Sequence, residues 1–176
     1  ANGFALVGTF RIAEPVPHVR AAIELGGDVA VVTKEGIIAM SSVFRSATVA
    51  QKAQALSEKI RGSFIDQVAA TGARAGWELF LSPNGDKLIA NYPTGSTATP
   101  FQQFVFNPVI GAWCRFTGIN SHTWGKFAGD IYFGSGSGTV FKMSADSKSD
   151  AGETINADCR TAFNYFGNRS RIKQFN

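Results

Sequence analysis

The chain has little of what enzymes, metalloproteins and membrane proteins usually show in their sequences. Its 176 residues contain two histidines and two cysteines, none with a metal-ligand neighbour at the usual spacing. No serine lies in a Gly-x-Ser-x-Gly turn, and no apolar run approaches the roughly 18 residues of a membrane span. The first residues also lack the basic and apolar regions of a signal peptide. These absences predict a protein that is not an enzyme, holds no metal or cofactor, and does not enter a membrane.

The histidines and cysteines are expected to have structural roles. His18 and His122 lie far apart in the sequence, which favours structural or exposed positions for both. Cys114 and Cys159 are expected to be small buried side chains in a reducing compartment. A disulfide between them stays open as an alternative.

Charged residues are sparse, and the small basic excess is unevenly distributed. The formal net charge of +4 is by itself weak support for a nucleic-acid partner. Basic and aromatic residues gather near the end of the chain: Arg160, Tyr165, Phe166, Arg169, Arg171 and Lys173. This segment is a solvated basic end, a contact for an acidic partner or DNA phosphate, or a strand edge that docks on a neighbouring subunit.

Glycine and phenylalanine, in contrast, are abundant, with 19 and 15 copies. Aromatic residues favour strands, and glycine supplies the turns between strands. The composition therefore favours a mainly β fold.

A Gly-Asp pair followed by an apolar run recurs along the chain. The copies are Gly27-Asp28, Gly85-Asp86 and Gly129-Asp130. A repeat of roughly 40–50 residues that reads as short strands has the spacing of propeller blades. Each aspartate is expected to close a turn by accepting hydrogen bonds from backbone N–H groups. Paired glycosidase carboxylates or a calcium site are the alternatives.

Short apolar runs between Gly, Pro, Asn and Asp turns predict the strands. The predicted strands cover residues 5–12, 19–25, 29–33, 37–40, 77–82, 87–92, 102–107, 112–117, 123–127, 131–133, 139–143 and 155–163. The polar stretch 144–152 is expected to form an exposed loop.

Apolar residues at steps of three and four predict a helical segment around 47–70. We expect one long helix or two short ones, with Thr48 or Ser57 as a cap and Gly62 as a weak point. The predicted fold is mainly β, with partial propeller-like blades built as antiparallel four-stranded meanders and with this one helical insert.

The predicted organisation is a single propeller-like domain that is part of a larger protein. Strands of a first blade occupy residues 1–46, the helical insert 47–76, a second blade 77–118 and a third blade 119–176. Trp77, Trp113 and Trp124 are expected to fill gaps between blade faces, and a sugar-binding platform is the alternative.

Several stretches resemble a virion structural protein of short-tailed bacteriophages and prophages, of the phage stabilisation or tail protein family. They are residues 102–107, 111–118, 129–134 and 162–167, the last followed by Arg169 and Arg171. Gly27-Asp28 with its following strands and the segment 56–61 also fit the pattern. The likeness covers most of the chain and is densest from Trp77 onward.

This resemblance implies a β-propeller-like protein in the neck or tail of the particle, similar to nozzle or DNA-plugging components that follow the portal. It implies a protein made in the bacterial cytoplasm and located in the virion. The expected partners are other virion proteins such as portal and tail components, with a homo-oligomeric ring and DNA contact as further expectations. Closed propellers have about 4–8 blades, and this chain supplies about three.

Two other functions stay open at this point. One is a carbohydrate-binding or glycoside-cleaving propeller that acts on a host surface, which would need two carboxyl groups about 5–10 Å apart beside an open tryptophan. The other is a general protein-interaction propeller, because a fold alone does not define a function.

Overall fold

The structure is a computed structural model, and it describes residues 12–45, 55–95, 100–144, 147 and 149–154. The chain divides into two compact units, Ala1–Ser144 and Ala145–Asn176. Nearly all described residues belong to the first unit.

The first sheet is an antiparallel meander of β1 (Ala22–Leu25), β2 (Asp28–Thr33) and β3 (Gly36–Ala39). Leu25 pairs with Asp28 across a two-residue turn in which Gly26 and Gly27 have φ of 60° and 81°. A turn with positive φ at both central residues matches the twist of a hairpin, and glycine adopts it without strain.

Helices follow the first sheet. α1 spans Met40–Arg45, so the strand predicted to reach residue 40 ends at residue 39. The short 3-10 helix η1 (Glu58–Ile60) leads directly into α3 (Arg61–Thr71), within the segment expected to be helical. Gly62, which was expected to be a weak point of the helical segment, is the second residue of α3. Residues 46–54, including Thr48, lie outside the described part.

The second sheet has four strands in the order β4 (Glu78–Leu81), β5 (Leu88–Pro93), β6 (Phe101–Asn107) and β7 (Ala112–Phe116). All pairs are antiparallel, as predicted for a meander. Every residue of β5 is buried. This burial explains its nearly continuous apolar sequence, because a strand covered on both faces does not alternate apolar and polar residues.

The third sheet contains β8 (Ser121–Phe127), β9 (Asp130–Ser135) and β10 (Val140–Met143), again antiparallel. In the second unit, β11 (Ser149–Asp150) and β12 (Glu153–Thr154) form a small hairpin with exposed residues. The stretch 144–152, predicted as an exposed loop, therefore includes a strand and a turn. The strand predicted at 155–163 lies outside the described residues.

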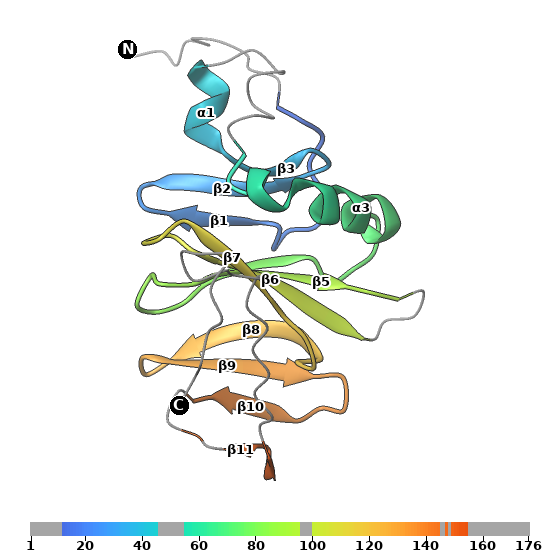
Figure 1. The fold of residues 1–176 in the computed structure, drawn as a ribbon, viewed down its shortest axis with the longest axis vertical. Helices are drawn as coiled ribbons and strands as arrows, with labels where there is room; N and C mark the ends of the chain where they lie inside the picture. The colour runs from blue at the N-terminus through green and yellow to red at the C-terminus, as the bar shows by residue number, and fades with distance from the viewer. Residues whose placement is uncertain (1–11, 46–54, 96–99, 145–146, 148, 155–176) are drawn as a thin grey trace, which may run out of the picture. The chain divides into compact units, whose positions relative to one another are not determined.

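The three sheets stack, and the second sheet lies in the middle (Figure 1). One core, formed with α3, fills the space between the first two sheets with Val32, Ile37, Phe64 and Trp77 among its members. A second core packs Phe80, Ile89, Val105 and Trp124 between the second and third sheets. Neighbouring residues of β5, such as Ile89 and Ala90, enter different cores because successive side chains of a strand point to opposite faces.

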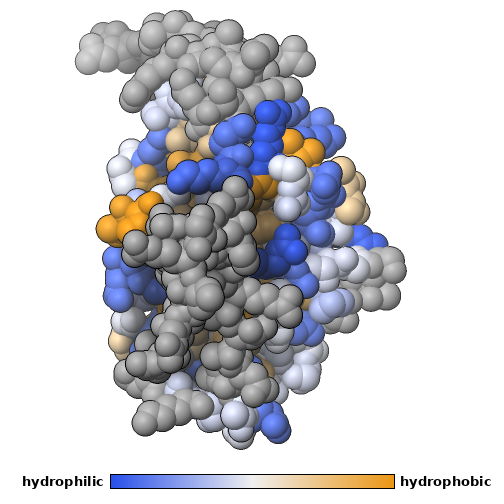
Figure 2. Space-filling view, viewed as in Figure 1, coloured by the Kyte–Doolittle hydropathy of each residue, from blue (hydrophilic) through white to orange (hydrophobic). Residues whose placement is uncertain are grey.

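The fold is thus mainly β and consists of small antiparallel sheets, and the described residues form no closed barrel or propeller. None of the described helices is long and apolar enough to cross a bilayer. On the face drawn in Figure 2, hydrophobic colour is confined to small patches among hydrophilic residues.

Candidate functional site

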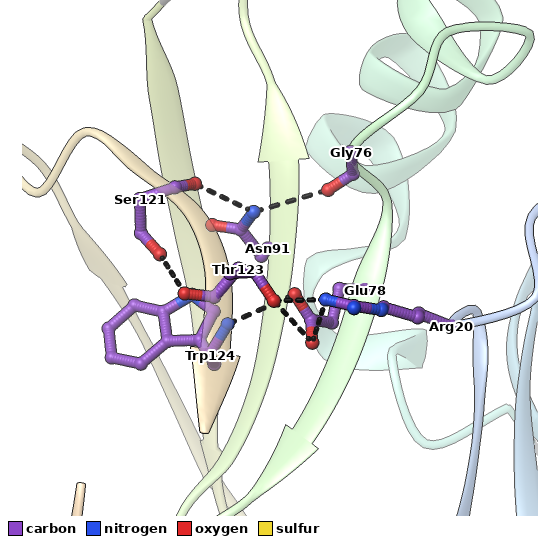
Figure 3. Close-up of polar contacts among 7 residues, drawn as sticks. All are labelled: Arg20, Gly76, Glu78, Asn91, Ser121, Thr123 and Trp124. Atoms are coloured by element: carbon purple, nitrogen blue, oxygen red, sulfur yellow. Dashed lines mark hydrogen bonds and ion pairs between the residues drawn. The ribbon is translucent and has the colours of Figure 1, made fainter. Parts of the chain in front are cut away.

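The three sheets meet around one buried carboxylate. Among the described residues, Glu78 is the one charged residue that is buried, at 7% exposure. It opens β4 in the second sheet, while Arg20 precedes β1 and Thr123 and Trp124 lie in β8 (Figure 3). The junction is therefore assembled from three segments that are distant in sequence.

Hydrogen bonds use both oxygens of the Glu78 carboxylate. The backbone N–H of Trp124 donates to Oε2 at 3.1 Å, and the Thr123 hydroxyl donates to Oε1 at 3.5 Å. Arg20 Nη1 lies 3.4 Å from the same Oε1 and also donates to the Thr123 hydroxyl. One carboxylate on the second sheet thus contacts the third sheet and the segment that precedes β1 (Figure 3).

The electrostatics of this junction follow from its burial. Desolvation raises the pKa of Glu78 above its ordinary value, because the charged form loses water. The Trp124 N–H group and the Arg20 guanidinium act in the opposite direction, since both favour the carboxylate. Burial is the larger effect.

Two buried amides extend the polar junction. Asn91 on β5 donates from Nδ2 to the carbonyl oxygens of Gly76 at 3.1 Å and Ser121 at 3.0 Å (Figure 3). Gln103 on β6 donates from Nε2 to Asn91 Oδ1 at 2.9 Å and to the Ile119 carbonyl at 3.0 Å. These bonds fasten the chain that enters β8 to the middle of the second sheet.

A pocket of about 240 Å³ opens beside the junction, and it brings together both histidines of the chain. His18, Arg20, Glu78 and His122 all contribute to its lining. The Nε2 atoms of His18 and His122 are buried, and neither has a hydrogen-bond partner in the part of the chain described. The sequence favoured structural or exposed positions for both histidines, and their convergence is visible only in the fold.

The contacts of the junction are made within the protein. Its single carboxylate is occupied by donors from the protein, and the described residues contain no group of three or more His, Cys, Asp or Glu side chains that could hold a metal ion. Sequence reasoning missed Arg20, Glu78, Asn91 and Gln103. A usable signal was present, since Glu78 and Asn91 interrupt otherwise apolar strands.

Two of the three tryptophans are buried in the cores between sheets, and the third is half-buried. Trp77 is 1% exposed and stacks on Tyr92. Trp124 is 5% exposed, and the centroid of its ring lies 5.3 Å from that of Phe133. Trp113 is half-buried, and its indole N–H donates to the Leu56 carbonyl at 3.0 Å. Two of the three rings therefore present no open face for a sugar.

The glycines of the Gly-Asp repeat all lie in the left-handed region of backbone space. Gly27, Gly85 and Gly129 have φ of 81°, 69° and 84°. Residues with a Cβ are strained in this region, so glycine suits each of these turns.

The aspartates of the repeat differ in their partners. Asp28 accepts from the backbone N–H groups of Val29 at 2.7 Å and Ser41 at 3.1 Å. Asp86 accepts from the Ser82 hydroxyl and pairs with Lys87, and these contacts lower its pKa. Asp130 Oδ2 lies 2.6 Å from Lys142 Nζ. The Asp86 and Asp130 carboxylates therefore contact residues of their own hairpins, and the Asp28 carboxylate also contacts the start of α1.

Cys114 differs from the expectation of a buried thiol. It lies on β7 with an exposed side chain and is a free cysteine. The expectation was wrong for this residue because β7 is an edge strand of the second sheet in the described part of the chain. Desolvation by nearby groups still raises the pKa of its thiol.

The candidate contact residues near the end of the chain lie outside the described residues. They are Arg160, Tyr165, Phe166, Arg169, Arg171 and Lys173, and Cys159 belongs with them. Their proposed roles stay predictions.

No protein-family model, no curated protein and no solved structure matches this chain.

Proposed function

We propose that the chain is a structural component of a bacteriophage particle, in its tail or neck, and that its stacked sheets act as blades of a propeller-like assembly. The observation that carries the proposal is the contact between leading strands. β1 packs on β4, and β4 packs on β8, so the first strand of each sheet meets the first strand of the next. In a propeller, successive sheets pack against one another and repeat radially around a central channel.

The Glu78 junction supports a structural role for this stack. Glu78 and Thr123 lie on the leading strands of the second and third sheets, and polar contacts join both to Arg20, which precedes β1. Directional bonds between sheets define their relative angle more narrowly than apolar packing does. A fixed angle between repeated sheets is what a ring-shaped assembly requires.

The outer face of the third sheet supports an assembly with further sheets. Phe127 is 75% exposed and Val140 is 69% exposed. Cross-strand pairing places both on the face opposite Trp124 and Phe133, which point into the core. Exposed apolar residues on a sheet face favour burial against a further blade of the same assembly.

The proposed partners are other virion proteins, with the portal and tail components as the first candidates. The basic end of the chain, with Arg169 and Arg171, would face an acidic partner or the path of packaged DNA. Its support is the composition of the sequence.

The test is mass spectrometry of intact particles purified after prophage induction of the source strain. Peptides of this chain in a fixed ratio to those of the portal protein would support the proposal, with abundant host cytosolic proteins measured as the control for contamination. Absence from particles, with the protein present in the lysate, would overturn it.

The carbohydrate alternative depends on Trp113, since its ring is half-buried whereas Trp77 and Trp124 are buried. Its test is a glycan array with the purified protein. Binding that Trp113→Ala abolishes would favour it over the structural role.

A further inference from the structure

A groove of about 480 Å³ lies between β7 and the residues that lead into α3. Its lining includes Lys59, Arg61, Trp113, Cys114 and Arg115, and we call it the β7 groove. β7 is an edge strand of the second sheet in the described chain. Edge strands carry backbone N–H and C=O groups that can pair with an added strand.

The β7 groove is positively charged, and its cations are held in place. It is lined by three basic residues, Lys59, Arg61 and Arg115, and by one carboxylate, that of Glu58. Glu58 Oε1 lies 3.8 Å from Arg61 Nη1. The Arg115 guanidinium lies 5.2 Å from the centre of the Phe104 ring, a cation–π contact. Lys59 Nζ donates to the Gly111 carbonyl at 2.7 Å.

The turn between β6 and β7 adds exposed apolar side chains to this region. Val109 is 81% exposed and Ile110 is 71% exposed. Asn107 Oδ1 accepts from the backbone N–H groups of both residues, at 2.9 Å and 3.3 Å. Because Lys59 ties Gly111 to the groove, the apolar pair is held on an ordered turn beside the cations. Neighbouring exposed apolar residues, unlike single scattered ones, are one mark of a protein contact.

We propose that the β7 groove binds an extended acidic segment of another protein, which pairs with β7 as an added strand. The strand edge would supply main-chain hydrogen bonds, as in other cases of strand addition to a sheet edge. Lys59, Arg61 and Arg115 would face carboxylates, and Val109 and Ile110 would contact apolar side chains. The observations favour a polypeptide over DNA, because phosphates use neither a strand edge nor an exposed Val-Ile pair.

The inference goes beyond the structural role proposed above and does not depend on the phage assignment. It rests on residues of this chain alone. A chain that never enters a virion could still bind an acidic segment here, so the two proposals fail independently.

The experiment is fluorescence anisotropy with a labelled peptide of alternating Val and Glu, which places carboxylates on one face of a strand. A matched Val-Lys peptide and a labelled DNA oligonucleotide are the comparison probes. We expect the acidic peptide to bind and the Val-Lys peptide not to. In Arg61→Glu and Arg115→Glu variants, we expect binding of the acidic peptide to weaken at least about tenfold.

The matched control is Lys126→Glu, which makes the same charge change at an exposed position on β8 outside the groove. It should stay within about twofold of the unaltered chain, because Lys126 does not line the groove and salt weakens interactions between exposed charges. Circular dichroism of all variants checks that each one folds.

Strand pairing is tested separately with two further acidic peptides. One is N-methylated at every odd-numbered residue and the other at every even-numbered residue. The backbone N–H groups of a paired strand point alternately toward and away from the neighbouring strand. The peptide whose methyl groups replace the donors that face β7 should therefore lose at least about tenfold in affinity, and the other peptide should retain binding. Equal binding by both, no binding by the parent acidic peptide, or a groove-dependent preference for the oligonucleotide would each overturn the proposal.

Discussion

The backbone N–H group of Trp124 donates a hydrogen bond to the carboxylate of Glu78 at 3.1 Å, across 46 residues of sequence. The bond joins the second sheet to the third at a buried position. Removing one member of such a pair leaves the other without a partner and without water. The junction is therefore the place where a single substitution should have its largest effect on stability.

Glu78→Ala should lower the free energy of unfolding by about 2–4 kcal/mol, because the Trp124 N–H and the Thr123 hydroxyl lose their acceptor. Urea denaturation followed by tryptophan fluorescence measures the change. Glu24→Ala is the matched control, since Glu24 is exposed on β1, and it should change stability by no more than about 0.5 kcal/mol. Equal effects of the two substitutions would contradict a structural role for the junction.

The pH dependence of stability should carry the signature of Glu78. Its pKa is raised in the folded state, so the folded protein holds this proton more tightly than the unfolded chain does. The stabilising contribution is complete below the ordinary value of 4.5 and is lost as the pH rises through the higher folded-state pKa. The difference in unfolding free energy between the unaltered chain and Glu78→Gln should therefore fall with rising pH. If the difference in unfolding free energy instead grew as the pH rises above 4.5, the pKa of Glu78 would be lowered in the folded state and not raised.

Gly76→Ala should destabilise the protein more than Gly85→Ala. Both residues have positive φ, 110° and 69°, so each substitution strains the backbone by about 1–2 kcal/mol. A Cβ at Gly76 would also overlap the Phe101 ring, whereas the space at Gly85 is open. The extra loss at Gly76 should be about 1–3 kcal/mol, as for overpacked cores, and thermal unfolding of both variants measures it. Equal losses would mean that the ring moves aside freely.

Asp28→Ala should destabilise the start of α1. The Asp28 carboxylate accepts from the backbone N–H of Ser41, which is the second residue of that helix, at 3.1 Å. Loss of a helix-capping acceptor typically costs about 1 kcal/mol. Asp66→Ala, at an exposed position inside α3, is the control and should be neutral or slightly stabilising. Hydrogen exchange at Ser41 should become faster in Asp28→Ala alone, and unchanged exchange would argue against the cap.

The helical start signals show where sequence reasoning fell short. Ser57 was a candidate cap, but its hydroxyl makes no cap hydrogen bond and instead accepts from the Ile37 backbone N–H at 3.0 Å. α1 was not predicted, because six residues give too short a pattern and its capping carboxylate, Asp28, comes 13 residues before Ser41. Side chains that serve a distant element give no local signal.

The described strands of the three meanders were predictable from the sequence, whereas β11 and β12 were not. Apolar runs broken by residues such as Gly26, Gly27 and Gly85 placed the three meanders, because strand periodicity and turn conformation depend on neighbouring residues. The fold alone reveals that Arg20, Glu78 and Trp124 meet, that His18 and His122 share a pocket, and that Cys114 is exposed. These facts depend on how the sheets stack and which strand lies at an edge. Long-range packing sets both, and no local pattern encodes it.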